Sequence, residues 1–457
     1  MNKPTKRAAR APSAPAAAQA PATSPAPERG FSYSRPFFED LVDRALAHAK
    51  KLGATDAGAE ASEGCGLSVS VRKGELENVE RNRDKSLGVT VYIGHRRGNA
   101  STSDFSDKAI EQTVQAAYDI ARFTAEDPMA GLPDADDIAP PETHRDLDLF
   151  HPWAIDSEQA ARLAMECEAA ALKTSRRITN SEGAGVSAQQ SHFFSAHTRG
   201  FRGGYASSRH SFSVAPIAVD ASGDMQRDYW FSSERSAADL ASPEAVGRYA
   251  AERTLSRLGA KKLSTRSCPV LFDAPLAAGL LGSFVQGTSG GALYRKNSFL
   301  QDSLGQQIFP QNLSIHEDPF VLRGKGSSPC DGEGCRVQAR DVVQQGVVQG
   351  YFLSSYSARK LGRRSNACAG RSVGGGPHVS TSNLVVTPGS GDRAALCAGI
   401  KRGLYVTDLM GFGFNAVTGD FSRGAGGFLI EDGQLTQPVS EITLSANFDD
   451  LLKRIDA

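Results

Sequence analysis

The feature of this sequence that most constrains its fold is a set of polar–apolar alternations that reverse at glycine-containing turns. Polar and apolar residues alternate through the segment 66–82, with an interruption at Lys73–Gly74. The segment 86–103 repeats the pattern around His95–Gly98. A period of two residues is typical of a strand with one buried face, and a glycine turn between two such runs predicts a β-hairpin.

Other parts of the chain combine similar hairpins with helices. Two more hairpins are predicted with turns at Gln345–Gly346 and Asp432–Gly433. Strands and helices do not alternate regularly, so the predicted class is α+β: an N-terminal helix and antiparallel-sheet region followed by a β-rich C-terminal domain. Helices are predicted, from apolar residues at helical spacing and from capping signals, over 37–53, 106–126, 156–173 and 243–258.

Changes in composition divide the chain into four ranges. The first is rich in Ala and Pro and free of acidic residues until Glu28, so it is predicted to be a disordered tail; a transit peptide is the alternative. In the third, strands are predicted through 177–233 with breaks at 182–183, 202–204 and 222–223. The ranges are the tail 1–34, an N-terminal α+β domain 35–150, a central α+β region 151–262 and the β-rich domain 266–457.

Charge and cysteine content exclude several classes of partner. Lys+Arg and Asp+Glu are equal at 51 each, so no overall field attracts nucleic acid or an anionic membrane, and no apolar run is long enough for a membrane span. Seven scattered cysteines without a CxxC pair favour a reducing cytoplasm. Basic clusters at Arg72–Lys73, Arg96–Arg97 and 359–364 are expected to be solvated surface, with phosphate or carboxylate binding as the alternative.

One short motif suggests a nucleophile. Residues 287–291, Gly-Thr-Ser-Gly-Gly, match the G-x-S-x-G pattern of serine hydrolases, and Asp302 and His316 follow Ser289 in the required order. However, the motif needs a strand before the serine and a helix after it. The preceding segment is predicted to be a helix, Gly290 and Gly291 oppose an immediate helix, and His316 is predicted to lie in a polar loop. Ser289 is therefore expected to lie in a turn.

The histidines and the long glycine-rich loop leave alternatives open. None of the nine histidines forms H-E-x-x-H, and whether His192, His197 and His210 converge cannot be judged from their spacing. The segment 362–383 has no periodicity and is predicted to be a mobile loop. Its amides and arginines suit an extended peptide, but simple flexibility explains them equally well.

Long stretches of the chain resemble the TldD/PmbA metallopeptidase family, specifically its PmbA (TldE) branch. The resemblance begins at "GATDAGAEASEGCGLSVSVRKGELENVERN" and continues through "GTSGGALYRKNSFLQDSLGQQI" and "GVVQGYFLSSYSARKLG" to "DLMGFGFNAVTGDFSRGAGGFLIEDGQ". It covers nearly everything after the tail. It implies a heterodimeric peptidase that cleaves small or unfolded peptides, in which a TldD-type partner carries a His-Glu-x-x-x-His zinc motif and a cysteine.

Alignment with that motif places Gly282, Ser283 and Gly287 where the partner has histidine, glutamate and histidine. The resemblance therefore implies no catalytic residue, no metal ligand and no cofactor in this chain, with zinc in the partner. PmbA-type chains usually continue somewhat beyond Ala457, so we expect a shortened C-terminus.

The expected function is that of a non-catalytic, cytoplasmic PmbA-like subunit. Its expected partners are a TldD-like subunit and a peptide, and neither nucleic acid nor a membrane. The peptide contacts are unknown, although backbone at 287–291 and 370–376 could pair with an extended substrate. The alternatives are a stand-alone serine hydrolase that uses Ser289 and a non-enzymatic peptide-binding homodimer.

Overall fold

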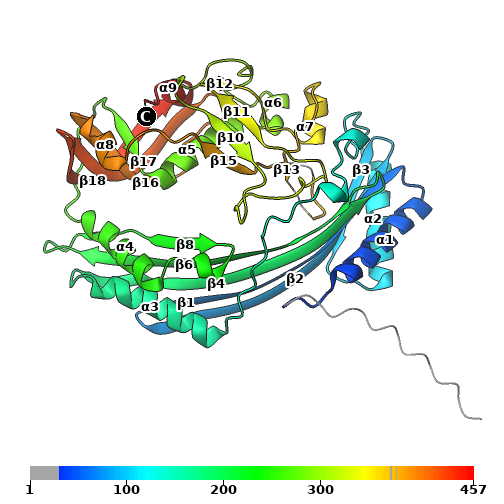
Figure 1. Ribbon diagram of the computed structural model, residues 1–457, viewed down its shortest axis with the longest axis horizontal. Coiled ribbons are helices and arrows are strands. Elements are labelled where there is room, and N and C mark those ends of the chain that lie inside the picture. Colours follow the sequence, from blue (N-terminus) through cyan, green and yellow to red (C-terminus); the bar gives the residue numbers. More distant parts are fainter. Residues whose placement is uncertain (1–29, 371–372, 377, 457) are drawn as a thin grey trace, which may run out of the picture.

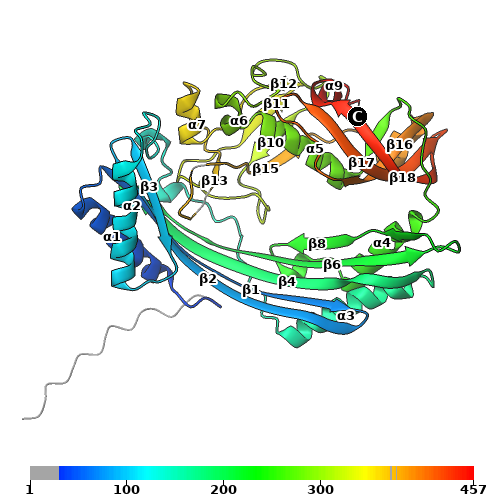
Figure 2. The same ribbon diagram turned by 180° about the vertical axis from the view of Figure 1, so that it is seen from behind.

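A long, curved, antiparallel sheet forms the first half of the computed structural model, which describes residues 30–370, 373–376 and 378–456 (Figures 1 and 2). Its strands are β1 Asp56–Arg72, β2 Glu75–Ile93, β3 Arg96–Thr102, β4 Ile178–His197, β5 Arg202–Gly203, β6 Ala206–Val219, β7 Met225–Arg227 and β8 Trp230–Glu234. Their order is β3-β2-β1-β4-β6-β7, with β5 on β4 and β8 on β6. Because β1 pairs with both β2 and β4, the ranges 35–150 and 151–262 contribute strands to the same sheet.

Helices cover one face of this sheet at both of its ends. Ala57, Ala59 and Ala61 of β1 pack under one helix pair, and Leu67, Val69 and Val71 of the same strand pack under the other. All six positions are odd, and alternate residues of a strand share a face, so both helix pairs lie on the same, outer face. The pairs are α1 Arg35–Lys51 with α2 Asp107–Phe123, and α3 Ser157–Lys173 with α4 Pro243–Ser256.

The inner face carries small and polar residues. The even positions of β1 from 58 to 70 are three glycines, three serines and Glu60. The C-terminal half of the molecule lies across this face, on the inside of the curve (Figures 1 and 2). The small and polar inner face therefore lies between the two halves of the molecule.

The predicted hairpins form, although the strands extend further than the sequence patterns indicate. Lys73 and Gly74 join β1 to β2 with φ of 55° and 76°, a turn in which both residues are left-handed. The break predicted at Glu182–Gly183 is wrong: β4 continues through it with a register shift between Ser181 and Ala184. A bulge of this kind bends a strand without ending it, which is why a glycine there resembles a turn in the sequence.

Residues 30–34, which precede the predicted start of structure at residue 35, are part of the described fold. Residues 1–29 lie outside the described residues, but residues 30–34 pack against the sheet. Phe31 is buried, with its ring centroid 4.0 Å from that of His192. The carboxylate of Glu63 accepts hydrogen bonds from the backbone N–H groups of Ser32 and Tyr33 at 3.0 and 3.1 Å. These anchors explain why the tail prediction is wrong for its last five residues.

The C-terminal half is built from three small sheets and short helices. One sheet has the order β12-β11-β10-β15, the second is β13-β14, and the third is β18-β17-β16-β9. "SIHEDP" was predicted as a loop, but β10 forms there because its backbone pairs with both β11 and β15. The elements are β9 Val270–Phe272, α5 Ala274–Gly287, α6 Gly290–Tyr294, β10 Ile315–Asp318, β11 Arg340–Gln344, β12 Val347–Val348, α7 Ser355–Lys360, β13 Ala369–Gly370, β14 His378–Val379, β15 Asn383–Val386, α8 Arg393–Ala398, β16 Arg402–Met410, β17 Asp420–Glu431, β18 Gln434–Asn447 and α9 Phe448–Lys453.

The α+β class is therefore confirmed. Among the described residues, no helix combines the length and the apolar character needed to cross a bilayer. All seven cysteines are free thiols.

Candidate functional site

The segment before Ser289 is helix α5, as its composition predicted. Asp273 caps its N-terminus by accepting the Ala274 N–H at 3.1 Å, and Leu280 and Phe284 anchor it in the C-terminal core. A helix in this place is incompatible with the strand that a nucleophile elbow requires.

Ser289 forms a cap between two helices. Its hydroxyl donates to the Gln286 carbonyl at 3.0 Å and accepts from the Ala292 N–H at 3.4 Å. The expectation that Gly290 and Gly291 oppose an immediate helix is wrong, since α6 begins at Gly290. Capping by Ser289 compensates for the low helix propensity of glycine, and the Gly290 N–H also donates to the Phe352 carbonyl at 2.8 Å.

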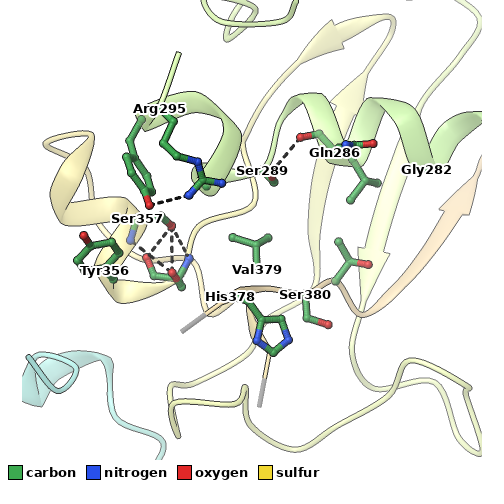
Figure 3. Close-up of a pocket in the computed structure, with 14 residues that line it drawn as sticks. Gly282, Gln286, Ser289, Arg295, Tyr356, Ser357, His378, Val379 and Ser380 are labelled. Atoms are coloured by element: carbon green, nitrogen blue, oxygen red, sulfur yellow. Dashed lines mark hydrogen bonds between the residues drawn. The ribbon is translucent and has the colours of Figure 1, made fainter. Parts of the chain in front are cut away.

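A pocket of about 510 Å³ lies beside this cap (Figure 3). Gly282 and Gln286 of α5 form one wall, and Arg295, just after α6, forms another. The start of α7 and residues 378–381 complete it, and several hydroxyl groups line it. The lining includes Ser289, Tyr294, Ser354, Tyr356, Ser357, His378, Ser380 and Thr381. Such a surface offers hydrogen bonds to a polar chain, beside apolar side chains such as Val285 and Val379.

The structure does not bring Asp302 and His316 to this pocket. His316 lies on β10, is exposed, and makes a 2.8 Å contact between its Nδ1 and Asp341 Oδ1. Neither His316 nor Asp302 lines the Ser289 pocket, whereas His378 does. The suggested hydrolase residues are therefore not assembled.

The geometry of α5 shows what the positions aligned with the partner's zinc motif could bind. Gly282 is exposed, and a Cβ built there would meet no atom within 4 Å. Gly287 is buried, and its Cβ direction points to the Phe299 ring at 3.0 Å and to Leu300 at 3.2 Å. Glycine offers no side-chain ligand, and position 287 faces the core. The residues present at 282, 283 and 287 do not fit a zinc ion.

The basic cluster 359–364 clasps the connector that follows α2. Arg359 donates to the carbonyls of Gly131 and Leu132 at 3.2 and 2.6 Å and pairs with Asp134. Arg364 binds Asp137 at 2.8 Å. These arginines thus have a structural role, which non-local contacts reveal and the sequence pattern does not.

Next to this clasp, Asp127 receives two donors from α7. The Tyr356 hydroxyl donates to one carboxylate oxygen at 2.6 Å, and Lys360 donates to the other at 2.9 Å. Burial, together with the bond to Asp127, raises the pKa of Tyr356, so this phenol stays protonated. Residues 371–372 and 377 of the predicted mobile loop lie outside the described residues. The described part is held in place, for example by Asn366 at 2.6 Å from the Tyr351 carbonyl.

A second polar cluster was missed in the sequence. Asp331, Glu333 and Cys335 place one ligand-type atom each within 4.8 Å of one another. The Asp331 carboxylate accepts three backbone N–H groups, from Glu333, Cys335 and Ala369, so it organises this loop. Burial and the neighbouring Glu333 raise the pKa of Asp331 to about 7, and burial also raises the pKa values of Glu333 and Cys335. In the sequence, the D-x-E-x-C spacing of these three residues is the feature that could have indicated the cluster.

The three strand histidines have separate surroundings. His192 lies 3.3 Å from Glu63 on the outer face, and His210 contacts the His151 carbonyl at 2.8 Å. His197 lies on the inner face, where its Nδ1 accepts the Arg199 N–H at 3.2 Å. They make no common metal site.

Three family models match the chain in order. They describe domain 1 (residues 59–121), the central domain (150–258) and the C-terminal domain (265–457) of PmbA/TldA metallopeptidases. The chain therefore belongs to the PmbA/TldD metallopeptidase family.

Relatives support this assignment along most of the chain. It is 45% identical to "Metalloprotease PmbA" of Escherichia coli O157:H7, covering 92% of this chain and 91% of that protein. It is 42% identical to the PmbA homologue of Haemophilus influenzae, covering 91% of each.

Solved structures share the fold. A protein of Bacteroides thetaiotaomicron described as a modulator of DNA gyrase gives a TM-score of 0.85 at 27% identity, covering 92% and 93% of the two chains. TldE of Thermococcus kodakarensis, at 16% identity, gives a TM-score of 0.78 over 90% and 92%, a likeness of fold alone.

Proposed function

We propose that this metalloprotease-like chain is the PmbA-type, or TldE-type, subunit of a heterodimeric zinc peptidase. In this arrangement a TldD-type partner holds the zinc, and this chain helps to hold a small or unfolded peptide. The observation that carries the proposal is the geometry of α5. At the aligned positions this helix has Gly282, Ser283 and Gly287, and position 287 faces Phe299 and Leu300 in the core.

The pocket beside α5 supports a role in peptide binding. It is lined by hydroxyl groups and by Gln286, which suit the polar backbone of an extended peptide. Zinc in a partner would supply water activation and carbonyl polarisation. This chain would contribute by positioning the scissile bond, an effect that can lower a barrier by several kcal/mol.

The test is to produce this chain alone and together with a TldD-type chain. Alone, it is expected to hold no stoichiometric zinc and to cleave no unfolded peptide. The mixture is expected to cleave it in a chelator-sensitive reaction, with zinc in the partner. Chelator-sensitive cleavage by this chain alone would refute the proposal. Native mass measurement of the isolated chain tests the homodimer alternative, which predicts a mass of two chains in the absence of a partner.

The serine-hydrolase alternative has its own test. Ser289→Asn removes the hydroxyl but keeps a good N-cap, so α6 should remain formed. The variant is expected to retain the activity of the complex, and the wild-type chain should resist a fluorophosphonate label. A hundredfold loss of activity together with labelling of Ser289 would favour the hydrolase.

A further inference from the structure

A second pocket lies between the inner face of the sheet and the C-terminal half. Its volume is about 130 Å³, close to the ~150 Å³ that accommodates a benzene-sized group. Tyr92 and His197 come from the sheet, Arg97 from its edge strand β3, and Glu333 from the loop of the polar cluster. Glu60 also lines this pocket. Glycine backbone makes up much of the remaining wall.

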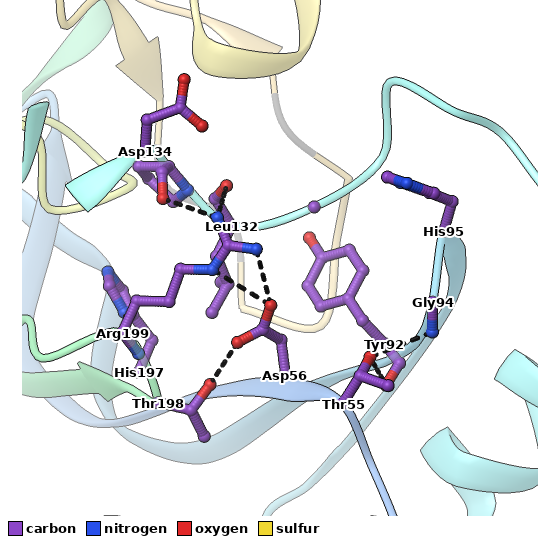
Figure 4. Close-up of polar contacts among 12 residues, drawn as sticks. Thr55, Asp56, Tyr92, Gly94, His95, Leu132, Asp134, His197, Thr198 and Arg199 are labelled. Carbon is purple, nitrogen blue, oxygen red and sulfur yellow. Dashed lines mark hydrogen bonds and ion pairs between the residues drawn. The ribbon is translucent and has the colours of Figure 1, made fainter. Parts of the chain in front are cut away.

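Two buried donors at this pocket have no acceptor. His197 is 8% exposed, and because its Nδ1 accepts the Arg199 N–H, its Nε2 carries the proton. That Nε2 makes no hydrogen bond, and neither does Nε of Arg97. Figure 4 shows His197 beside Arg199 and Leu132, with Arg199 directed to Asp56, so that arginine does not satisfy the ring. Buried donors without partners are rare and indicate a missing acceptor.

The opposite wall supplies the complementary charge. Glu333 accepts the Ser355 N–H at 2.9 Å and faces the pocket from the C-terminal half. A group that satisfies both walls needs a positive donor next to an acceptor oxygen. An α-ammonium group with its neighbouring carbonyl oxygen has this pair of features three bonds apart.

We infer that this pocket binds an α-amino group together with the carbonyl oxygen beside it. Glu333 receives the ammonium group, and His197 and Arg97 donate to the oxygen. Two sources share this chemistry: the amino terminus of a peptide and a free amino acid. The inference deepens the proposed function, since a pocket for the amino terminus would position a peptide along the inner face.

A cation held directly by Asp331, Glu333 and Cys335 fits the structure less well. Three backbone N–H groups already occupy the Asp331 carboxylate, and Arg97 and Arg359 place positive charge near Glu333. The protonated Nε2 of His197 cannot ligate a metal while Nδ1 accepts a hydrogen bond.

The experiment measures binding to the full chain by calorimetry, using four probes. These are Ala-Ala-Ala amide, its N-acetyl derivative, an N-acetylated tripeptide amide that contains lysine, and free L-alanine. The free-amine tripeptide is expected to bind at least tenfold more tightly than both acetylated peptides. Binding of L-alanine as well would identify the free amino acid as a second source. Equal binding of the acetylated peptides would overturn the inference.

Substitutions of residues that line the pocket test whether the free-amine peptide binds there. Glu333→Gln should weaken it about tenfold or more, since the bond to the ammonium group is charge-assisted. His197→Asn keeps an acceptor for the Arg199 N–H but loses the Nε2 donor, so it should weaken binding about fivefold, whereas His197→Gln, with a distal donor, should restore part of it. Glu111→Gln, on the exposed face of α2, is the matched control. Unchanged binding in folded Glu333→Gln and His197→Asn would refute the assignment.

The result of this binding experiment can be distinguished from the result of the cleavage test of the proposed function. Binding of free-amine peptides without partner-dependent cleavage would leave the pocket assigned and the heterodimer proposal refuted. Partner-dependent cleavage without such binding would give the reverse result.

Discussion

At the scale of single residues, the pKa values of two carboxyl groups, Glu63 and Asp331, are shifted in opposite directions. Burial alone would raise the pKa of Glu63, but hydrogen bonds from Ser32 and Tyr33, with His192 and Arg83, hold it below the ordinary value of 4.5. At Asp331, burial and Glu333 prevail and raise the pKa to about 7. The difference lies in the partners: Glu63 has a cation, Arg83, at 2.7 Å, while Asp331 has an acid beside it.

Glu63→Gln is expected to lower the free energy of unfolding by about 1–3 kcal/mol at pH 7, because the buried carboxylate accepts two backbone N–H groups and pairs with the half-exposed Arg83. A depressed pKa contributes stability that is present above the unfolded-state value and lost as the pH falls through the folded-state value. The difference from wild type should therefore shrink below about pH 4.5. Urea unfolding at pH 7 and pH 4 checks this, with Glu111→Gln as control. A pH-independent difference would contradict it.

Glu333→Gln tests the raised pKa of Asp331. That pKa rises from 3.8 to about 7, so the folded state binds more protons, and stability falls as the pH rises through this window. Removing the neighbouring charge should lower the pKa of Asp331 and make the fall smaller. Urea unfolding of both proteins at pH 5 and pH 8 measures the effect. Parallel losses in wild type and variant would show that the two carboxyl groups do not interact.

At the scale of elements, the sequence predicted what local chemistry decides. The turns at Lys73–Gly74, Gln345–Gly346 and Asp432–Gly433 each need positive φ at both residues, which the glycine marks directly. Four helices were likewise visible from spacing and caps. Strand β10 and helix α6 were missed, because the pairing of β10 with two other strands and the contact of Gly290 with Phe352 are non-local.

For the candidate site too, local features could be predicted from the sequence, whereas features that depend on non-local contacts could not. The substitution of Gly282 and Gly287 for ligands could be predicted from a family resemblance, but the core-facing direction of position 287 could not. The amino-group pocket joins Arg97, His197 and Glu333, from segments about a hundred residues or more apart in the chain. Long-range pairing of β1 with β4, and the packing of the C-terminal half on the inner face, bring them together.

Helix α5 offers a matched pair of substitutions. Gly282→Ala should raise the free energy of unfolding by about 0.5–1 kcal/mol, because the added Cβ meets nothing and restricts the unfolded chain. Gly287→His should lower it by about 1–3 kcal/mol, because the ring must displace Phe299 and Leu300. Thermal and urea unfolding measure both changes. High-affinity zinc binding by the combined Gly282→His, Ser283→Glu, Gly287→His variant would contradict the core-facing geometry.

The clasp on the 127–137 connector gives an element-scale prediction. Arg359→Lys cannot reproduce the guanidinium bonds to Gly131, Leu132 and Asp134, so stability should fall by about 1–3 kcal/mol. Limited proteolysis should then cleave the connector faster. Arg336→Lys is the control, since its side chain is exposed nearby. Equal cleavage rates in both variants would show that the clasp does not hold the connector.

At the scale of the whole molecule, a buried charge network joins the two halves. Arg253 of α4 lies between Asp228, at 3.3 Å, and Asp273, at 3.0 Å. Asp273 is also the N-cap of α5 and accepts the Tyr405 hydroxyl at 2.7 Å. Arg257 reaches Asp408 of β16 at 2.9 Å. The helix that lines the first pocket is thereby oriented by a residue of the sheet-forming half.

Arg253→Met should consequently affect both stability and cooperativity. It removes the cation that Asp228 and Asp273 share and leaves Asp228 with Arg257 alone, at 3.5 Å, which should cost about 3 kcal/mol. Because the arginine bridges the halves, its loss should also weaken their coupling. Calorimetry should then resolve two unfolding transitions in the variant and one in the wild type. Arg248→Met, on the exposed side of the same helix, should leave the profile unchanged. A uniform fall in midpoint with an unchanged single transition would show that the network stabilises one half only and does not couple α5 to the sheet.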